Sequence, residues 1–191
     1  MAIIINGSTT IKYLTVDTSN VMKKGYVDNS ILVYSADEEI YKDGVLKGAT
    51  ITGFVNNDEG YPNKLRLKSG LPNYWATNPD TGERYIVHTT DTKTGYITFN
   101  MTDFDHITVK GSYGGWARFA NAYVKLGLDS ASEQIGSGYP APPVPFTRTY
   151  NVSSLTGNHS IVGLSYCNNI SGEVGISPNI DIYITEIIAY T

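Results

Sequence analysis

The stretch Ile180-Asp181-Ile182-Tyr183-Ile184-Thr185, near the end of the chain, alternates apolar and polar residues one by one. An earlier stretch, Ile97-Thr98-Phe99-Asn100-Met101-Thr102, has the same alternation. A period of two places every second side chain on one face of an extended strand, so both stretches predict β-strands with one buried face. Such strands must bury their apolar faces against one another, which favours a sandwich or a barrel.

Further strand-like segments follow at a spacing of roughly ten residues with turn signals between them, as in β-sandwiches. The expected strands lie near residues 40–41, 50–55, 64–68, 85–88, 96–101, 106–110, 122–128, 147–151, 160–166 and 180–190. Residues 78–82 are typical of a tight turn, and the proline-rich segment 139–145 predicts an extended loop. The single helix candidate is short, at Asp129–Ile135. The expected fold class is all-β, with an antiparallel jelly-roll-like β-sandwich.

A small β unit is expected to precede the sandwich. Residues 1–36 contain several short strand-like segments, among them Ile31–Tyr34. The polar, acidic stretch 35–39 then separates them from the rest of the chain. We therefore expect a small N-terminal β unit at residues 1–37 and the sandwich at residues 38–191.

Composition restricts the class of partner. Charged residues make up only 17% of the 191 residues, and the formal net charge is -4. This balance argues against a general nucleic-acid partner, because phosphate binding needs clustered Lys and Arg. The largest basic group, Lys64, Arg66 and Lys68, is expected on one solvated face of a strand. The 15 tyrosines and 19 glycines suit β-strands and polar loops that contact uncharged partners such as sugars.

The single cysteine, Cys167, excludes an intrachain disulfide and a cysteine-ligated metal site. Its strand-like context predicts a buried small apolar side chain. No signal peptide is visible, and no run approaches the ~18 apolar residues that cross a bilayer. We expect no membrane insertion.

Two parts of the chain resemble known families. Residues 23–35, Lys-Lys-Gly-Tyr-Val-Asp-Asn-Ser-Ile-Leu-Val-Tyr-Ser, are similar to a small unit that recurs in tail and baseplate-associated proteins of phages and prophages from Firmicutes-type gut bacteria. Residues 96–109, 149–161 and 182–187 are similar to segments of jelly-roll, carbohydrate-binding-like modules. The resemblance implies a phage or prophage tail-associated protein located in the virion. Such a protein is made in the host bacterial cytoplasm and needs no signal peptide.

Aromatic residues in loop-like contexts are the candidate binding residues. Tyr74 and Trp75 follow a Gly-Leu-Pro-Asn segment, and Tyr113 and Trp116 lie in a glycine-rich stretch with Arg118 nearby. Sugar rings pack their apolar faces on flat aromatic rings, while polar side chains bind their hydroxyl groups. The alternative is that both tryptophans seal the ends of the sandwich.

Acidic residues give weaker candidates for a metal site. Asp58 and Glu59 form one pair, and Asp103 and Asp105 another. Calcium takes several oxygen ligands from such loops, but neither pair has the spacing of a complete calcium loop. No nucleophile, histidine or phosphate-loop motif is present, so we expect no enzyme, no catalytic residue and no cofactor other than a structural calcium ion.

The expected function is that of a non-catalytic virion or prophage tail adhesion module that binds surface glycans through loop aromatics. The alternative is a purely structural head or tail decoration protein that binds other virion proteins and no sugar, with a homotrimer as the expected assembly. A third reading, a glycan-cleaving enzyme, lacks a clear second carboxylate opposite Asp103 or Asp105.

Overall fold

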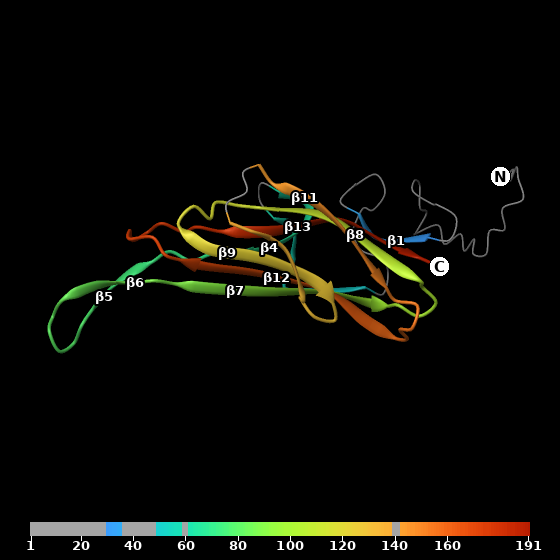
Figure 1. Cartoon of the computed structure of the whole chain (residues 1–191), viewed down its shortest axis with the longest axis horizontal. Helices are drawn as coiled ribbons and strands as arrows, with labels where there is room; N and C mark the ends of the chain where they lie inside the picture. Colours follow the sequence, from blue (N-terminus) through green and yellow to red (C-terminus); the bar gives the residue numbers. More distant parts are fainter. Residues whose placement is uncertain (1–29, 36–48, 59–60, 139–141) are drawn as a thin grey trace, which may run out of the picture.

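The computed structural model of the chain describes residues 30–35, 49–58, 61–138 and 142–191 (Figure 1). Within these ranges the chain forms strands, and it has no helix long and apolar enough to cross a membrane. The strands are β1 (Ser30–Ser35), β2 (Thr50–Thr52), β3 (Val55–Asp58), β4 (Tyr61–Ser69), β5 (Tyr74–Thr77), β6 (Arg84–Val87), β7 (Thr90–Asn100), β8 (His106–Gly114), β9 (Ala120–Leu128), β10 (Glu133–Ser137), β11 (Val144–Asn151), β12 (Asn158–Asn169) and β13 (Ile180–Tyr190).

Two antiparallel sheets form a sandwich, which confirms the expected fold class. Sheet A has the order β11-β8-β13-β4-β3, and sheet B has the order β10-β9-β12-β7-β2. Apart from the β9–β10 hairpin, the strands from β7 to β13 alternate between the two sheets, as in a jelly roll. The hairpin β5–β6 is a separate two-stranded sheet that projects from one end (Figure 1).

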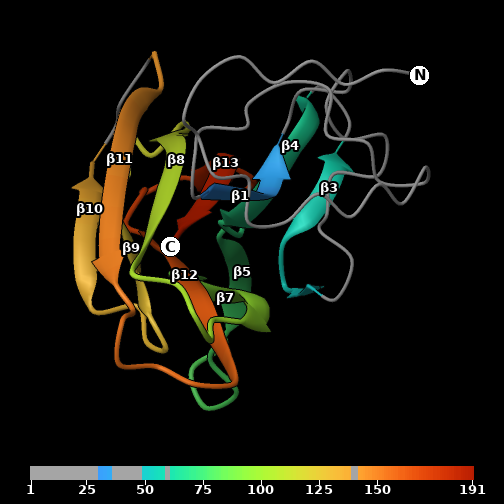
Figure 2. The same cartoon turned by 90° about the vertical axis from the view of Figure 1, so that its right-hand side faces the viewer.

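One edge of the sandwich is closed by the neighbouring strands β10 and β11. Figure 2 looks onto the end that carries the C-terminus and shows these strands side by side. Arg148 on β11 pairs there with Glu133 on β10 across 2.5 Å. β11 is the outermost strand of sheet A and pairs with β8 only. Pro145, which has no N–H group to donate, is therefore tolerated in it, as prolines are in edge strands.

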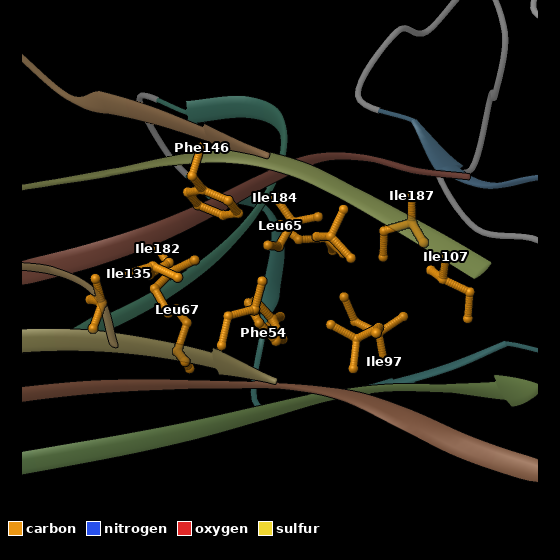
Figure 3. Close-up of a cluster of buried hydrophobic side chains, with 14 of the residues drawn as sticks. Phe54, Leu65, Leu67, Ile97, Ile107, Ile135, Phe146, Ile182, Ile184 and Ile187 are labelled. Atoms are coloured by element: carbon orange, nitrogen blue, oxygen red, sulfur yellow. The ribbon is translucent and has the colours of Figure 1, made fainter. Parts of the chain in front are cut away.

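The core lies between the two sheets and is made of the alternating apolar residues. In β13 the side chains of Ile180, Ile182 and Ile184 are fully buried, as are those of Ile97 in β7 and of Met101 directly after this strand. Each such side chain contributes about 1.5–3 kcal/mol when it leaves water. Figure 3 shows the two layers of side chains meeting: Leu65, Leu67, Ile107, Phe146, Ile182, Ile184 and Ile187 from sheet A, and Ile97 and Ile135 from sheet B.

Phe54 fills a space in this core that two glycines leave open. Gly95 on β7 and Gly163 on β12 are paired across the strands of sheet B. A Cβ atom at Gly95 would lie 2.3 Å from the Phe54 ring, and one at Gly163 would lie 2.8 Å from it. The two glycines are therefore required by packing, since no larger residue fits beneath this ring.

Most of the expected strands are confirmed, whereas the one near residues 40–41 lies outside the described residues. Several local expectations are wrong. Residues 129–135 form no helix: the chain turns and then enters β10, which pairs with β9. Tyr74 and Trp75 lie in a strand, β5, and not in a loop. The glycine-rich stretch is strand up to Gly114, because Gly111 and Gly114 let the Tyr183 backbone and Pro143 approach closely.

β1 belongs to sheet A. Its residues pair with the C-terminal part of β13, from Ser30 with Tyr190 to Ser35 with Glu186. The other residues of the expected N-terminal unit and most of the expected boundary lie outside the described residues. The division of the chain at residue 37 therefore stays a prediction.

The expectation of a solvated basic face on β4 is wrong for Arg66. This side chain is 9% exposed and donates two hydrogen bonds to Oδ2 of the fully buried Asp181, of 2.8 and 3.1 Å. Tyr183 donates a further hydrogen bond of 2.7 Å to the same carboxylate oxygen. Paired and hydrogen-bonded charges can be buried where lone charges cannot.

Cys167 is buried, as expected, with 1% of its surface exposed. Burial raises the pKa of its thiol to about 11, and the carboxylates of Asp91 and Asp181 add to the increase. The thiol is therefore protonated at neutral pH and behaves as a small core side chain.

Candidate functional site

Exposed apolar side chains are concentrated at one end of the sandwich, which we call the aromatic end. Of the eleven large hydrophobic residues that are exposed in the described part of the chain, eight lie here. The other three, Val55, Tyr96 and Val144, lie on strands of the sheets. The aromatic end consists of Leu71, Tyr74, Trp75, Tyr85, Trp116, Phe119, Ile170 and Val174.

Three stretches of chain build this end, namely residues 70–91 with the hairpin, residues 115–119 and residues 170–179. In Figure 1 the hairpin, the β8–β9 connection and the β12–β13 connection all lie at the left of the molecule. The opposite end, which we call the turn end, carries the turns at residues 101–105, 129–132 and 152–157 (Figure 1).

Buried amide side chains hold the segments of the aromatic end together. Asn169 is 1% exposed and donates hydrogen bonds to the carbonyl oxygens of Leu71 (3.1 Å) and Ile176 (2.7 Å). Asn73, also 1% exposed, accepts from the backbone of Thr89 (3.0 Å) and donates to the carbonyl of Ser171 (2.8 Å). Because these polar groups are satisfied inside the protein, they fix the surrounding loops in one arrangement.

The hairpin β5–β6 presents aromatic rings on both of its faces. Its turn is held by Asn78, whose side-chain oxygen accepts from the backbone of Asp80 at 2.9 Å. Trp75, 48% exposed, lies on one face, and the Arg84 guanidinium stands 4.8 Å from the centre of its ring. Strand alternation places Tyr74 and Tyr85 on the other face, where both are about half exposed.

A second aromatic group follows β8. Trp116 and Phe119 meet edge to face with 6.1 Å between ring centres, and each is 38% exposed. The guanidinium of Arg118 lies 5.2 Å from the centre of the Phe119 ring. Backbone hydrogen bonds from Asn179 to Trp116 and from Ile170 to Phe119 join this group to the β12–β13 connection.

The expected binding residues are thus brought together in four of five cases. Tyr74, Trp75, Trp116 and Arg118 are all exposed at the aromatic end, and neither tryptophan is buried as a seal of the core. Tyr113 is different: it lies within β8, packs against the core and covers Gly136 of β10. A glycine is required opposite its ring because a Cβ atom there would lie 2.1 Å from it.

The acidic candidates lie elsewhere. Asp103 and Asp105 are exposed in the β7–β8 turn at the turn end, and Asp103 has a positive φ of 69°. Asp58 ends β3, and Glu59 lies outside the described residues. Among the residues that the structure describes, no three His, Cys, Asp or Glu side chains are grouped so as to hold a metal ion. The calcium expectation remains a prediction.

Sequence reasoning missed several residues of this end, among them Tyr85, Phe119, Leu71 and Ile170. The strand-like sequence around Tyr85 favours burial of a large apolar residue, and it does not indicate that the hairpin forms a sheet of its own. Ile170 and Leu71 carry no local signal of exposure. Their hydrophobicity favours burial, and only the neighbouring segments show that nothing in the described chain covers them.

No protein-family model matches the sequence, and no curated protein matches it. Solved structures with a distant likeness include CBM51 from Clostridium perfringens GH95 in complex with methyl-galactose, at 8% identity and a TM-score of 0.32, covering 83% of this chain and 99% of that one. A family 35 carbohydrate binding module from Clostridium thermocellum is similar at 13% identity and a TM-score of 0.24, over 83% of this chain and 96% of that one. The sandwich described above rests on the strand pairings of this chain alone.

Proposed function

We propose that this chain is a non-catalytic adhesion module that binds surface glycans with its aromatic end. One observation carries the proposal: eight exposed large apolar residues gather on segments that buried asparagines hold in place. A preformed group of rings with polar neighbours suits sugars, because the ring faces take the apolar side of a pyranose at little cost in side-chain entropy.

The setting that we propose is a phage or prophage tail, with the protein in the virion. The support is the similarity of residues 23–35 to units of tail-associated proteins, described above. An adhesion module in that position would contact the bacterial surface.

The test is a titration of the purified protein against an array of bacterial surface glycans, with tryptophan fluorescence as a second readout. We expect binding at up to millimolar sugar with a change in emission. Trp75→Ala and Trp116→Ala should each weaken binding about tenfold or more, since stacking and burial on a ring contribute about 1–3 kcal/mol.

The matched control is Tyr96→Ala. Tyr96 is 42% exposed, like the two tryptophans, but it lies on β7 and outside the aromatic end. Its loss should leave affinity unchanged. Equal losses for all three variants would contradict the proposed location.

The same surface suits a protein partner as well, because exposed apolar patches also mark protein interfaces. Light scattering distinguishes the two uses. A stable homotrimer in which both tryptophans become shielded from a soluble quencher, together with no glycan binding at millimolar sugar, would replace the adhesion proposal by a structural role in the virion.

A further inference from the structure

The four arginines of the chain, Arg66, Arg84, Arg118 and Arg148, fall into two classes. Arg66 pairs with Asp181, and Arg148 pairs with Glu133. Arg84 and Arg118 have no acidic partner within the described ranges, and each is held over an aromatic ring instead. Both arginines of this second class belong to the aromatic end.

Stacking on a ring orients a guanidinium without using its hydrogen-bonding edge. The planar group lies over the ring face, so its N–H donors can still bind an anionic oxygen in a bidentate manner. Each of these two positions therefore combines an apolar ring with a cation whose donors are available to a ligand.

Acidic residues at the aromatic end do not occupy these donors. Glu83 directly precedes β6 and its backbone N–H donates to the Thr81 hydroxyl, and Asp80 lies at the hairpin tip. Glu173 lies in the β12–β13 connection, where its backbone N–H donates to the Ser171 hydroxyl. Asp91, at the base of the hairpin, pairs with Lys93 and accepts a hydrogen bond from the Gly70 backbone. None of these four acidic residues makes an ion pair with Arg84 or Arg118.

We propose that the ligand of the aromatic end is an acidic glycan, whose carboxylate or phosphate groups bind Arg84 and Arg118 while its sugar rings pack on the neighbouring aromatic side chains. The proposal rests on the proposed glycan-binding function and adds the charge of the ligand to it. A neutral glycan would leave both guanidinium groups without the partner that their geometry fits.

The experiment compares an oligouronate with the same oligomer after methyl esterification of its carboxylates, and with a phosphodiester-linked sugar polymer as a separate arm. Isothermal titration at low and at high salt measures each affinity. We expect the free oligouronate or the phosphodiester polymer to bind roughly tenfold or more tightly than the ester, and added salt to reduce this difference. The arm that binds identifies the anionic group.

The double variant Arg84→Gln, Arg118→Gln should lose this preference, with a fall of roughly 10- to 100-fold in affinity for the acidic ligand, in the range of hydrogen bonds to charged groups. Affinity for the ester should change little. Arg84→Lys, Arg118→Lys keeps both charges but not the bidentate donors and should recover only part of the affinity. Arg148→Gln is the control, since it removes one positive charge away from the aromatic end.

The outcomes separate this inference from the function on which it rests. Equal binding of the free oligouronate, the phosphodiester polymer and the ester, or an unchanged affinity in the double glutamine variant, overturns the acidic ligand but leaves glycan binding through Trp75 and Trp116 in place. Failure of the wild-type protein to bind any of the three ligands or any array glycan overturns both proposals. The circular dichroism and thermal midpoint of each variant, which should match the wild type, exclude misfolding as the cause.

Discussion

The two ends of the sandwich are closed in different ways. At the turn end, apolar side chains point inward: Phe104 and Leu155 pack against the core. Backbone hydrogen bonds tie the turns together, from Met101 to Gly157 and from Val152 to Asp105. At the aromatic end the large apolar side chains point outward, and buried amides tie the segments together. The turn end is built for stability, whereas the aromatic end holds an apolar surface open to water.

The opposite arrangements have a physical consequence. Apolar groups that face water contribute nothing to folding, so the loops that carry them need another source of order. The side chains of Asn73 and Asn169 supply it through hydrogen bonds to backbone groups, and the Ser171 hydroxyl accepts one from the Glu173 backbone. The exposed apolar side chains of the aromatic end are therefore held in place by the buried polar groups beneath them.

The largest expected effect is that of Asn169→Ala. Removing this buried side chain leaves the carbonyl of Ile176 and the N–H of Ser171 without their partner. The Leu71 carbonyl loses one of two hydrogen bonds, because it also accepts from the Thr89 hydroxyl. We expect the free energy of unfolding to fall by roughly 2–4 kcal/mol, as for buried polar groups that lose their partners. Urea denaturation measures it. A loss below about 0.5 kcal/mol, as for ordinary surface substitutions, would show that the buried amides do not order the loops of the aromatic end.

A pair of glycine variants compares the two ends directly. Gly157 at the turn end has a φ of 84°, Gly82 at the hairpin tip has a φ of 72°, and a Cβ atom at either position would meet nothing within 4 Å. Alanine should therefore introduce only backbone strain, of about 1–2 kcal/mol at each position.

The two substitutions should differ in how far that strain spreads. Gly157→Ala should lower the global free energy of unfolding, because its turn is joined to the sandwich through the Met101 backbone. Gly82→Ala should mainly increase hydrogen exchange in β5 and β6, because this hairpin is a sheet of its own that can open locally. Equal changes in global stability would show that the hairpin unfolds with the core.

The turn end also contains an ion pair that depends on pH. Asp129, with a φ of 57°, accepts a hydrogen bond from His159 across 2.7 Å and another from the Ser160 backbone across 2.9 Å. The hydrogen bond to Asp129 raises the pKa of His159. Desolvation opposes ionisation of Asp129, but the bonds from Ser160 and His159 outweigh it and lower the pKa of the carboxyl group.

The sign of the pH dependence follows from these two shifts. The raised pKa of His159 gives stability that is present below 6.5 and is lost as the pH rises through the folded-state pKa. The lowered pKa of Asp129 gives stability that is present above 3.8 and is lost on acidification. Asp129→Asn keeps a side chain that tolerates positive φ, so its thermal midpoint should fall below that of the wild type most at about pH 5 and least at about pH 8. A difference that does not vary with pH would contradict a charged pair.

The smallest expected effect on stability is that of Trp75→Ala at the aromatic end. Nearly half of this side chain is exposed, and it contacts Arg84 rather than the core. The free energy of unfolding should change by less than about 0.5 kcal/mol, as is usual for surface substitutions. In the wild type, acrylamide should quench the emission of both tryptophans. A large loss of stability would show that this ring is structural and would remove the contrast between the ends.

Local sequence determined the sheets of this protein. Alternation in segments such as 97–102 and 180–185 gives the strands and their buried faces, because the side-chain period of a strand is a local property of the backbone. The sequence also showed two aromatic residues of the aromatic end, Trp75 and Trp116.

Tertiary structure alone decided which of those residues share a surface. Leu71, Phe119 and Ile170 are far apart in sequence and become neighbours only because β4 and β12 end, and β9 begins, at the same end of the sandwich. Tertiary contacts also determine which charged side chains are buried. Arg66 is buried against Asp181, 115 residues away, whereas Arg84 lies at the surface over the Trp75 ring. The physical reason is that burial and charge pairing depend on contacts between distant segments, and no local pattern of residues contains them.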